Sequence, residues 1–227
     1  MTILLHTLCG ANPARPFSPH CWKIVMALAH KGLEFTEAPV PFTAIPALEN
    51  GFSRTVPILN DRGHLVRDSF DIALYLEEAY ADAPSLFGGE GGKAAARFVE
   101  GYVQTLVHPA LMPFVVMPIH DLLPEKDKAY FRQSREARFG KPLEDVAESA
   151  DRALLSARLE PLRHVLKFQP FLGGEGPLFA DYIVFGALQW ARVTAGAPPL
   201  EEGDPVLAWF SRCLDLFHGL GRNVTAA

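Results

Sequence analysis

Short apolar runs, bounded by glycine, proline and polar residues, characterise the N-terminal part of the chain. Runs of this length that end in turn-forming residues are typical of β-strands. They fall at residues 2–8, 34–40, 55–61 and 63–68. The last two are separated by the tetrapeptide NDRG, whose composition favours a tight turn, so this pair predicts a β-hairpin.

Helical periodicity appears at two places among these runs. From Pro19 onward, apolar residues recur at spacings of three and four, as in an amphipathic helix, and Gly32 provides a stop. A second helix is predicted to begin at Ser69, in the segment SFDIALYLEEAY. The order strand, helix, strand, irregular segment, strand, strand, helix predicts a mixed βαβ-plus-hairpin unit with helices covering a small sheet.

The pattern changes after residues 81–92, ADAPSLFGGEGG, where small residues, glycine and proline are concentrated. This composition is typical of an interdomain linker. Beyond it, strand signals give way to helical periodicity interrupted by prolines and by the segment FLGGEGP. We therefore predict an α/β domain at 1–81, a linker at 82–93 and an all-α domain at 94–227.

Composition narrows the class of partner. The chain has 227 residues, 49% of them hydrophobic, which suffices for a sizeable core. A net charge of −5 without basic blocks argues against nucleic acid and anionic membranes, and favours small-molecule partners. Three cysteines without metal-ligand spacing argue against a disulfide framework and a metal site. With no targeting pattern and no long apolar span, a cytoplasmic protein is expected.

Pro57 lies inside the apolar run at 55–61, where proline removes a sheet hydrogen bond. A cis bond between Val56 and Pro57 would turn the backbone groups of Val56 toward an extended ligand. An edge strand is the alternative explanation, and the pattern alone does not choose between them.

Two candidate binding residues stand at the start of the second helix. Ser69 is predicted as its N-cap, where a hydroxyl and free backbone amides suit a carboxylate. Asp68, next to it, suits a cationic amine. Together they match the zwitterionic end of an amino acid or peptide, although an ordinary helix cap explains Ser69 equally well.

Ser18 precedes Pro19 and is predicted as the N-cap of the first helix. A helix N-terminus favours a thiolate beside it, so the hydroxyl of Ser18 could also activate the sulfur of a ligand. Cys21 falls on the apolar stripe of that helix and is expected to be buried and inert. Cys9, at a strand end, is the better candidate for an exposed thiol.

These motifs, taken in order, resemble the glutathione transferases. Members of that family have Ser, Tyr or Cys at the start of the first helix, matched by Ser18 in FSPHCWK, followed by a cis-proline, matched by TVP at 55–57, and an acidic residue with serine, matched by DS at 68–69. In FLGGEGPLFADYIVFGAL, Asp181 corresponds to the buried aspartate of the family's N-capping box. Leu178 stands where the family usually has Ser or Thr, so the reciprocal side-chain cap is expected to be lost.

The resemblance implies the glutathione transferase fold, with a thioredoxin-like N-terminal domain and an all-α C-terminal domain. It implies glutathione as co-substrate, no metal, and Ser18 as the catalytic residue. The implied glutathione-binding residues are Arg54, Thr55, Val56, Pro57, Asp68 and Ser69. Arg54 would hold the glycyl carboxylate, although a solvated surface arginine explains it equally well. The expected pocket for the second substrate comprises Cys9, Phe17, Tyr102, Leu106, Phe114, Met117 and Trp190.

The C-terminal half, including HDLLPEKDKAYFRQSREARFG and DPVLAWFSRCLDLFHGLGR, is similar to the bacterial glutathione-dependent β-aryl-etherases of lignin breakdown and to related fungal transferases. This implies an attack by the glutathione thiolate on an apolar, aromatic electrophile, in detoxification or in aromatic catabolism, by a homodimer. Two alternatives remain open. One is a glutathione-dependent thiol-disulfide reductase, and the other is a noncatalytic carrier of glutathione or aromatic ligands.

Overall fold

The computed structural model describes residues 2–227, and its N-terminal part is built on a four-stranded mixed sheet. The strands are β1 (Ile3–Leu8), β2 (Phe35–Val40), β3 (Ile58–Asp61) and β4 (His64–Arg67). Their order across the sheet is β2-β1-β3-β4, with β1 and β2 parallel and the other pairs antiparallel. The predicted βαβ-plus-hairpin arrangement is therefore confirmed.

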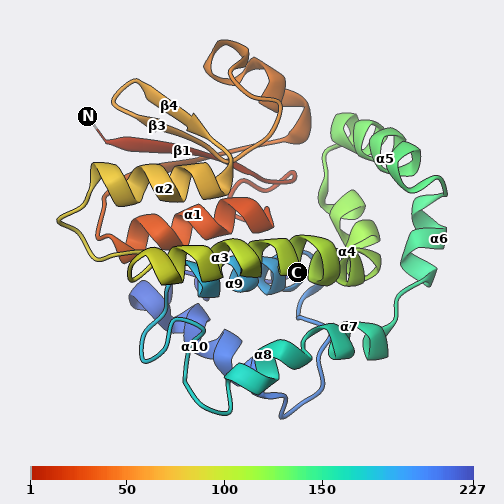
Figure 1. Ribbon diagram of the computed structural model, residues 1–227. Helices are drawn as coiled ribbons and strands as arrows, with labels where there is room; N and C mark the ends of the chain where they lie inside the picture. Colours follow the sequence, from red (N-terminus) through yellow and green to blue (C-terminus); the bar gives the residue numbers. More distant parts are fainter. Residues whose placement is uncertain (1) are drawn as a thin grey trace.

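Two helices lie between this sheet and the rest of the molecule (Figure 1). They are α1 (Pro19–His30) and α2 (Ser69–Ala79). The irregular segment between β2 and β3 contains a short 3₁₀ stretch, η1 (Phe42–Gly51), whose last residues leave the helical conformation. In Figure 1, this segment projects toward the upper end of the helical region.

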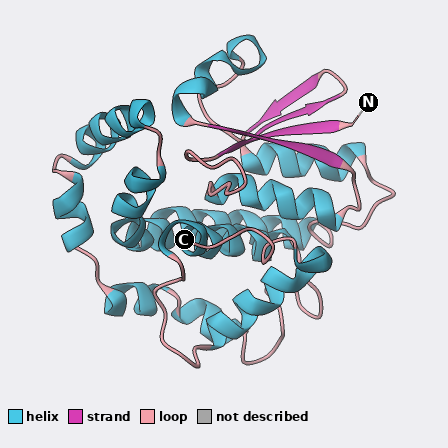
Figure 2. Cartoon of the chain, turned by 180° about the vertical axis from the view of Figure 1, so that it is seen from behind, coloured by secondary structure: helices cyan, strands magenta, loops and turns pink. Residues whose placement is uncertain are grey.

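The remainder of the chain is helical (Figure 2). Its elements are α3 (Glu90–Tyr102), the π-helical turn η2 (Val103–Val107), α4 (His108–Leu122), α5 (Glu125–Phe139), α6 (Leu143–Glu148), α7 (Arg152–Arg158), α8 (Glu160–Val165), α9 (Phe179–Ala195) and α10 (Pro205–Gly219). The small sheet followed by a helical region is the predicted fold class.

One helical run, Glu90–Leu122, is long and apolar enough to cross a membrane if only length and composition are considered. It comprises α3, η2 and α4, and each of these packs against α9. The apolar character of the run is therefore accounted for by packing within the protein.

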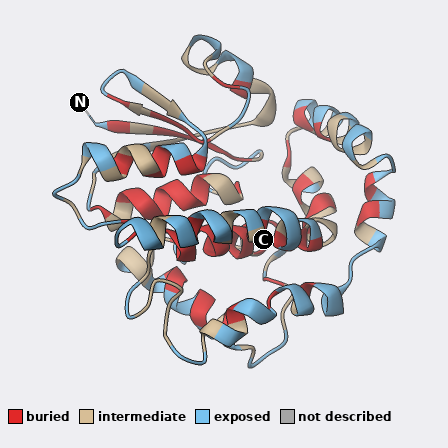
Figure 3. Cartoon of the chain, in the orientation of Figure 1, coloured by how far each residue is buried: buried red, intermediate tan, exposed pale blue. Residues whose placement is uncertain are grey.

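Helix α9 forms the centre of the core. Nearly every residue along it is buried (Figure 3), and its most extensive contact is with α1. A side-chain carbon at Gly186 would overlap the carbonyl oxygen of Pro19, so glycine permits the close approach of the two helices. The start of α1 is thus seated directly on α9.

The segment predicted as a linker is anchored to the core at two residues, although most of it is exposed. Leu86 and Phe87 are buried, and the N–H of Phe179 donates to the carbonyl of Leu86 over 2.7 Å. Helix α3 begins at Glu90, within the residues expected to be linker. The division at 82–93 therefore stays a prediction about domains, and two residues of this segment pack into the core.

Candidate active site

Ser18 lies at the N-terminus of α1 and lines a cavity of about 620 Å³. Its Oγ accepts the backbone N–H of Cys21 over 3.3 Å, and Pro19 follows at the first helical position. This confirms the predicted N-cap. Only 4% of Ser18 is exposed. A partly enclosed hydroxyl donor therefore stands beside the positive end of a helix dipole.

Two histidines stand in the cavity wall near this helix start. The rings of His20 and His108 are 5.4 Å apart, and His108 also contacts Trp190 edge to face at 5.8 Å. Burial, followed by the charge of Lys23, lowers the pKa of both histidines, that of His108 to about 3. Both imidazoles are therefore neutral at neutral pH. Neither histidine was predicted as a site residue from the sequence, although His20 stands two residues from Ser18.

A buried ion pair lies near these two histidines, outside the lining of the cavity. Lys23 is fully buried, and its Nζ lies 3.5 Å from Glu100 Oε1 and donates to Ser69 Oγ over 3.3 Å. Burial lowers the pKa of Lys23, whereas Glu100 opposes that shift. Through this contact, helices α1, α2 and α3 meet at one point.

A second cavity, of about 510 Å³, adjoins the first. Arg54 and Thr55 line both cavities. The second is also lined by Arg67, Asp68 and Asp71. The peptide bond between Val56 and Pro57 is cis, as predicted, and Val56 lines the first cavity.

The predicted cap of α2 was wrong by one residue. Asp68 is the N-cap, and its Oδ1 accepts the N–H groups of Phe70 over 2.8 Å and of Asp71 over 3.3 Å. Ser69 is the first helical residue, and its hydroxyl is buried against Lys23. The backbone of Asp68 has φ +67°, a conformation that a non-glycine residue seldom adopts and that is often found at functional sites.

Comparison with known proteins decides the family. The sequence profile described as "Glutathione S-transferase, N-terminal domain" matches residues 17–79, and the one described as "Glutathione S-transferase, C-terminal domain" matches residues 94–209. The chain belongs to the glutathione transferase family. The "Glutathione S-transferase-like protein ustS" of Aspergillus flavus is 28% identical over 83% of this chain and 78% of its own length.

Solved structures of transferases have the same fold. Glutathione transferase GSTFuA3 from Phanerochaete chrysosporium matches with a TM-score of 0.77 and 26% identity, covering 97% of this chain and 93% of its own. CsGST83044 from Ceriporiopsis subvermispora, solved in complex with glutathione, matches with a TM-score of 0.74 and 21% identity, covering 99% and 96% of the two chains. The latter supports the fold alone.

Of the residues expected to form the second-substrate pocket of this family member, Phe17 and Trp190 line the larger cavity. The others lie outside its lining: Cys9, Tyr102, Leu106, Phe114 and Met117. The hydroxyl of Tyr102 instead donates to the carbonyl of Arg158. Part of the wall of this cavity was not predicted from the sequence. It comes from η1 and α5, and includes Phe42, Tyr130 and Phe131.

The cysteines are poor candidates for chemistry. Cys9 is only 3% exposed, so the expectation of an exposed thiol was wrong. Burial, reinforced by Asp127, raises the pKa of Cys9 to about 11. Burial likewise raises the pKa of Cys21 to about 12, against the hydrogen bond from Ser18, in keeping with its predicted inert role. Neither thiol is a thiolate at neutral pH.

Asp181 is structural, as predicted. It is fully buried on α9, and its Oδ1 accepts the N–H of Leu172 over 2.7 Å and the indole N–H of Trp209 over 2.9 Å. Its Oδ2 accepts the N–H groups of Gly173 over 2.9 Å and of Leu178 over 3.0 Å. Leu178 has no side-chain acceptor to complete a reciprocal cap.

Proposed function

We propose that the protein is a transferase that activates the thiol of glutathione beside Ser18 and directs it at an apolar, aromatic electrophile. The single observation that carries this is the position of the Ser18 hydroxyl. Its oxygen caps α1, its O–H can donate to a ligand, and it lines a cavity large enough for substrate. The family supplies the co-substrate, and the Ceriporiopsis relative has been solved with glutathione.

In the proposed pose, glutathione extends from the first cavity into the second. Its sulfur faces Ser18, and its cysteinyl backbone pairs with Val56. Its γ-glutamyl ammonium faces Asp68, and Arg54, which lines both cavities, holds the glycyl carboxylate. Because Asp68 already accepts two N–H groups of the first turn, the N–H of Ser69 is the donor left for the γ-glutamyl carboxylate.

The chemistry requires a thiolate. The thiol loses its proton to solvent, the sulfur forms a bond to the electrophilic carbon, and the leaving group departs with the electron pair of its broken bond. The O–H of Ser18 and the dipole of α1 stabilise the thiolate, and the cavity aligns it with the electrophile. An aryloxide leaving group, as in a β-aryl ether, is the finer substrate class proposed from the resemblance. We also propose a homodimer in the cytoplasm.

The burial of Cys9 and the presence of serine at position 18 weigh against the thiol-disulfide reductase alternative. A noncatalytic carrier would bind glutathione without turnover. Replacement of Ser18 distinguishes the two, because it should slow conjugation by an enzyme, whereas a carrier has no conjugation to lose.

Ser18→Ala should raise the pKa of the bound thiol and reduce kcat/KM about 10- to 100-fold, which corresponds to the loss of one hydrogen bond to a charged group. Glutathione affinity should be largely kept, because most of the proposed contacts lie elsewhere. The measurements are thiolate absorbance against pH, and conjugation of 1-chloro-2,4-dinitrobenzene and of a β-aryl ether. Ser18→Thr, which keeps the hydroxyl and the cap, is the matched control. An unchanged thiol pKa together with unchanged rates would reduce Ser18 to a helix cap.

A further inference from the structure

Cationic side chains gather in the wall of the larger cavity. Arg54, Arg135, Arg138 and Lys141 all line it, whereas none of the described residues in that wall is an aspartate or a glutamate. The whole chain carries a net charge of −5. The cavity therefore has a charge opposite to that of the protein, and clefts of one sign concentrate ligands of the other.

None of these four cations is in an ion pair with another of the described residues. On α5, Arg132 pairs with Glu136 over 2.9 Å and with Glu144 over 2.8 Å, and it is not part of the cavity lining. Within residues 2–227, Arg135 and Arg138 have no ion-pair partner. Lys141 donates to a backbone carbonyl, that of Asp145, over 3.2 Å. The acidic residues nearest in sequence are thus committed to Arg132 rather than to the cavity.

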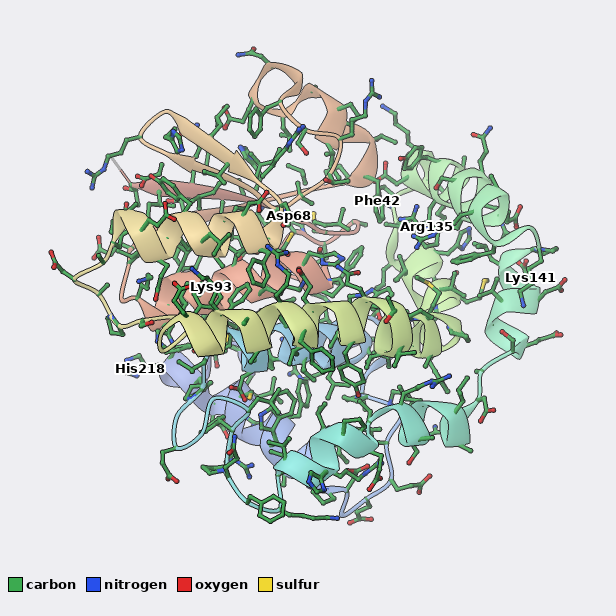
Figure 4. The ribbon with its side chains drawn as sticks, viewed as in Figure 1. Phe42, Asp68, Lys93, Arg135, Lys141 and His218 are labelled. Carbon is green, nitrogen blue, oxygen red and sulfur yellow. The ribbon has the colours of Figure 1, made fainter. Side chains whose placement is uncertain are left out.

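Arg135 is held against aromatic rings. Its guanidinium carbon lies 5.0 Å from the ring centroid of Phe131 and 5.6 Å from that of Phe42. Burial, followed by the charge of Arg138, lowers the pKa of Arg135. Since arginine stays protonated in proteins, this guanidinium is a partly desolvated charge without a counter-ion. Figure 4 shows Phe42 and Arg135 side by side on the α5 side, across from Asp68.

A planar anion attached to an aromatic ring fits both the guanidinium without a counter-ion and the aromatic rings beside it. Its ring would pack against Phe42 and Phe131, and its carboxylate would match the fork of N–H donors that arginine presents. The exposed side chains of Arg138 and Lys141 stand at the same wall and would add further positive charge.

We propose that the electrophile of this enzyme is an aromatic carboxylate, whose acid group binds Arg135, Arg138 and Lys141 while its reactive carbon faces the thiolate at Ser18. This inference rests on the proposed function and specifies its substrate class. The carboxylate takes no part in the reaction. In the test reaction below, a carbon–sulfur bond forms, a carbon–chlorine bond breaks, and chloride leaves with the electron pair.

The catalytic test compares 4-chloro-3,5-dinitrobenzoate with 4-chloro-3,5-dinitrobenzamide, each rate being divided by the uncatalysed rate with glutathione. The wild type should favour the acid at least about tenfold in kcat/KM, mainly through KM, because charge-assisted hydrogen bonds are among the stronger ones. The preference should decrease as salt is added.

Substitutions in the cavity wall show which residues cause the preference for the acid. Arg138→Gln and Lys141→Met change exposed side chains, and each should reduce the ratio of kcat/KM for the acid to kcat/KM for the amide. Arg135→Gln should reduce it most, and Arg135→Lys should restore part of it. Lys126→Met is the control, because it removes an exposed positive charge from α5 outside the cavity lining. If the acid is not preferred, or if its preference survives Arg135→Gln and Arg138→Gln, the inference is wrong.

A binding measurement separates this inference from the proposed function. The compound 3,5-dinitrobenzoate has no leaving group, so calorimetry with it and with 3,5-dinitrobenzamide reports binding alone. Selective binding of the acid that the Arg135 and Arg138 variants abolish supports the anion site even if no probe is conjugated, in which case the proposed transferase activity fails. Ser18-dependent conjugation of both probes without selectivity supports the transferase and overturns the anion site.

Discussion

Helices α2 and α9 both depend on an aspartate that accepts backbone N–H groups at the helix start, but the two starts differ in what surrounds them. Asp181 on α9 is fully buried, and both of its oxygens are occupied by donors from the protein. Asp68 on α2 is exposed in the wall of the second cavity, and only its Oδ1 accepts hydrogen bonds within residues 2–227.

The difference is between a carboxylate saturated by the protein and one that is open to solvent. A saturated, enclosed carboxylate has no capacity left for a ligand, whereas an open one can accept a hydrogen bond from an incoming cation. The same residue type near the start of a helix thus has a different capacity for a ligand, depending on its surroundings. Substitution of Asp181 should therefore change mainly the stability of the fold, and substitution of Asp68 mainly the affinity for glutathione.

The largest effect is expected from Asp181→Ala. It leaves four N–H donors without their acceptor, one of them buried and three partly buried, and at about 1 kcal/mol for each, the free energy of unfolding should fall by about 4 kcal/mol. Urea denaturation checks this. Asp151→Ala, at the exposed cap of α7, is the control and should cost about 1 kcal/mol. Equal losses in the two variants would contradict the distinction.

The cavity wall near Ser18 should make stability depend on pH. Burial lowers the pKa of His108 to about 3, against an ordinary value near 6.5 in an unfolded chain. Between these values the unfolded chain binds a proton that the folded chain does not, so stability falls as pH falls below about 6.5. From neutral pH to pH 5, this residue alone should account for about 2 kcal/mol.

His108→Phe keeps an aromatic ring against Trp190 and His20, and should lose less stability on acidification. Urea unfolding at pH 7.5 and pH 5 measures the difference. His164→Phe, at an exposed position outside the cavity, should behave as the wild type does. If His108→Phe retains the full pH dependence, the wall is less enclosed than the geometry indicates.

A smaller effect, on glutathione affinity, is expected from a substitution of Asp68 at the start of α2. Asp68→Asn removes the negative charge but keeps a good N-cap, so the fold should be unaffected and glutathione affinity should fall about tenfold. Titration calorimetry measures it, with Asp151→Asn as the matched change at a cap outside both cavities. Unaltered affinity would mean that the ammonium group of glutathione does not face Asp68.

Local signals account for what the sequence predicted correctly. The strands and α1 follow from apolar runs bounded by glycine and proline, and the cap at Ser18 follows from the proline after it. At the start of α2, however, Asp68 and Ser69 are both good capping residues. Only the positive φ of Asp68 decides between them, and no sequence pattern specifies it.

Contacts between distant segments could not be predicted in this way. The larger cavity joins Phe42 of η1 to Tyr130 and Arg135 of α5, which are far apart in the chain. Periodicity shows that α5 is a helix but not which element it will face. Nor does periodicity show which side chains of α4 face the cavity: Met112 lines it, whereas Met117, which was expected to, does not.

The contact between Gly186 and Pro19 limits how this protein can be recombined with its relatives. Because a single added carbon at position 186 would collide with the backbone at the start of α1, the two halves of the chain are fitted to each other at the site itself. A chimera that joins the sheet region of this protein to the helices of another transferase would need glycine at the position equivalent to Gly186. Without it, the first helix would have to shift, and Ser18 would move with it.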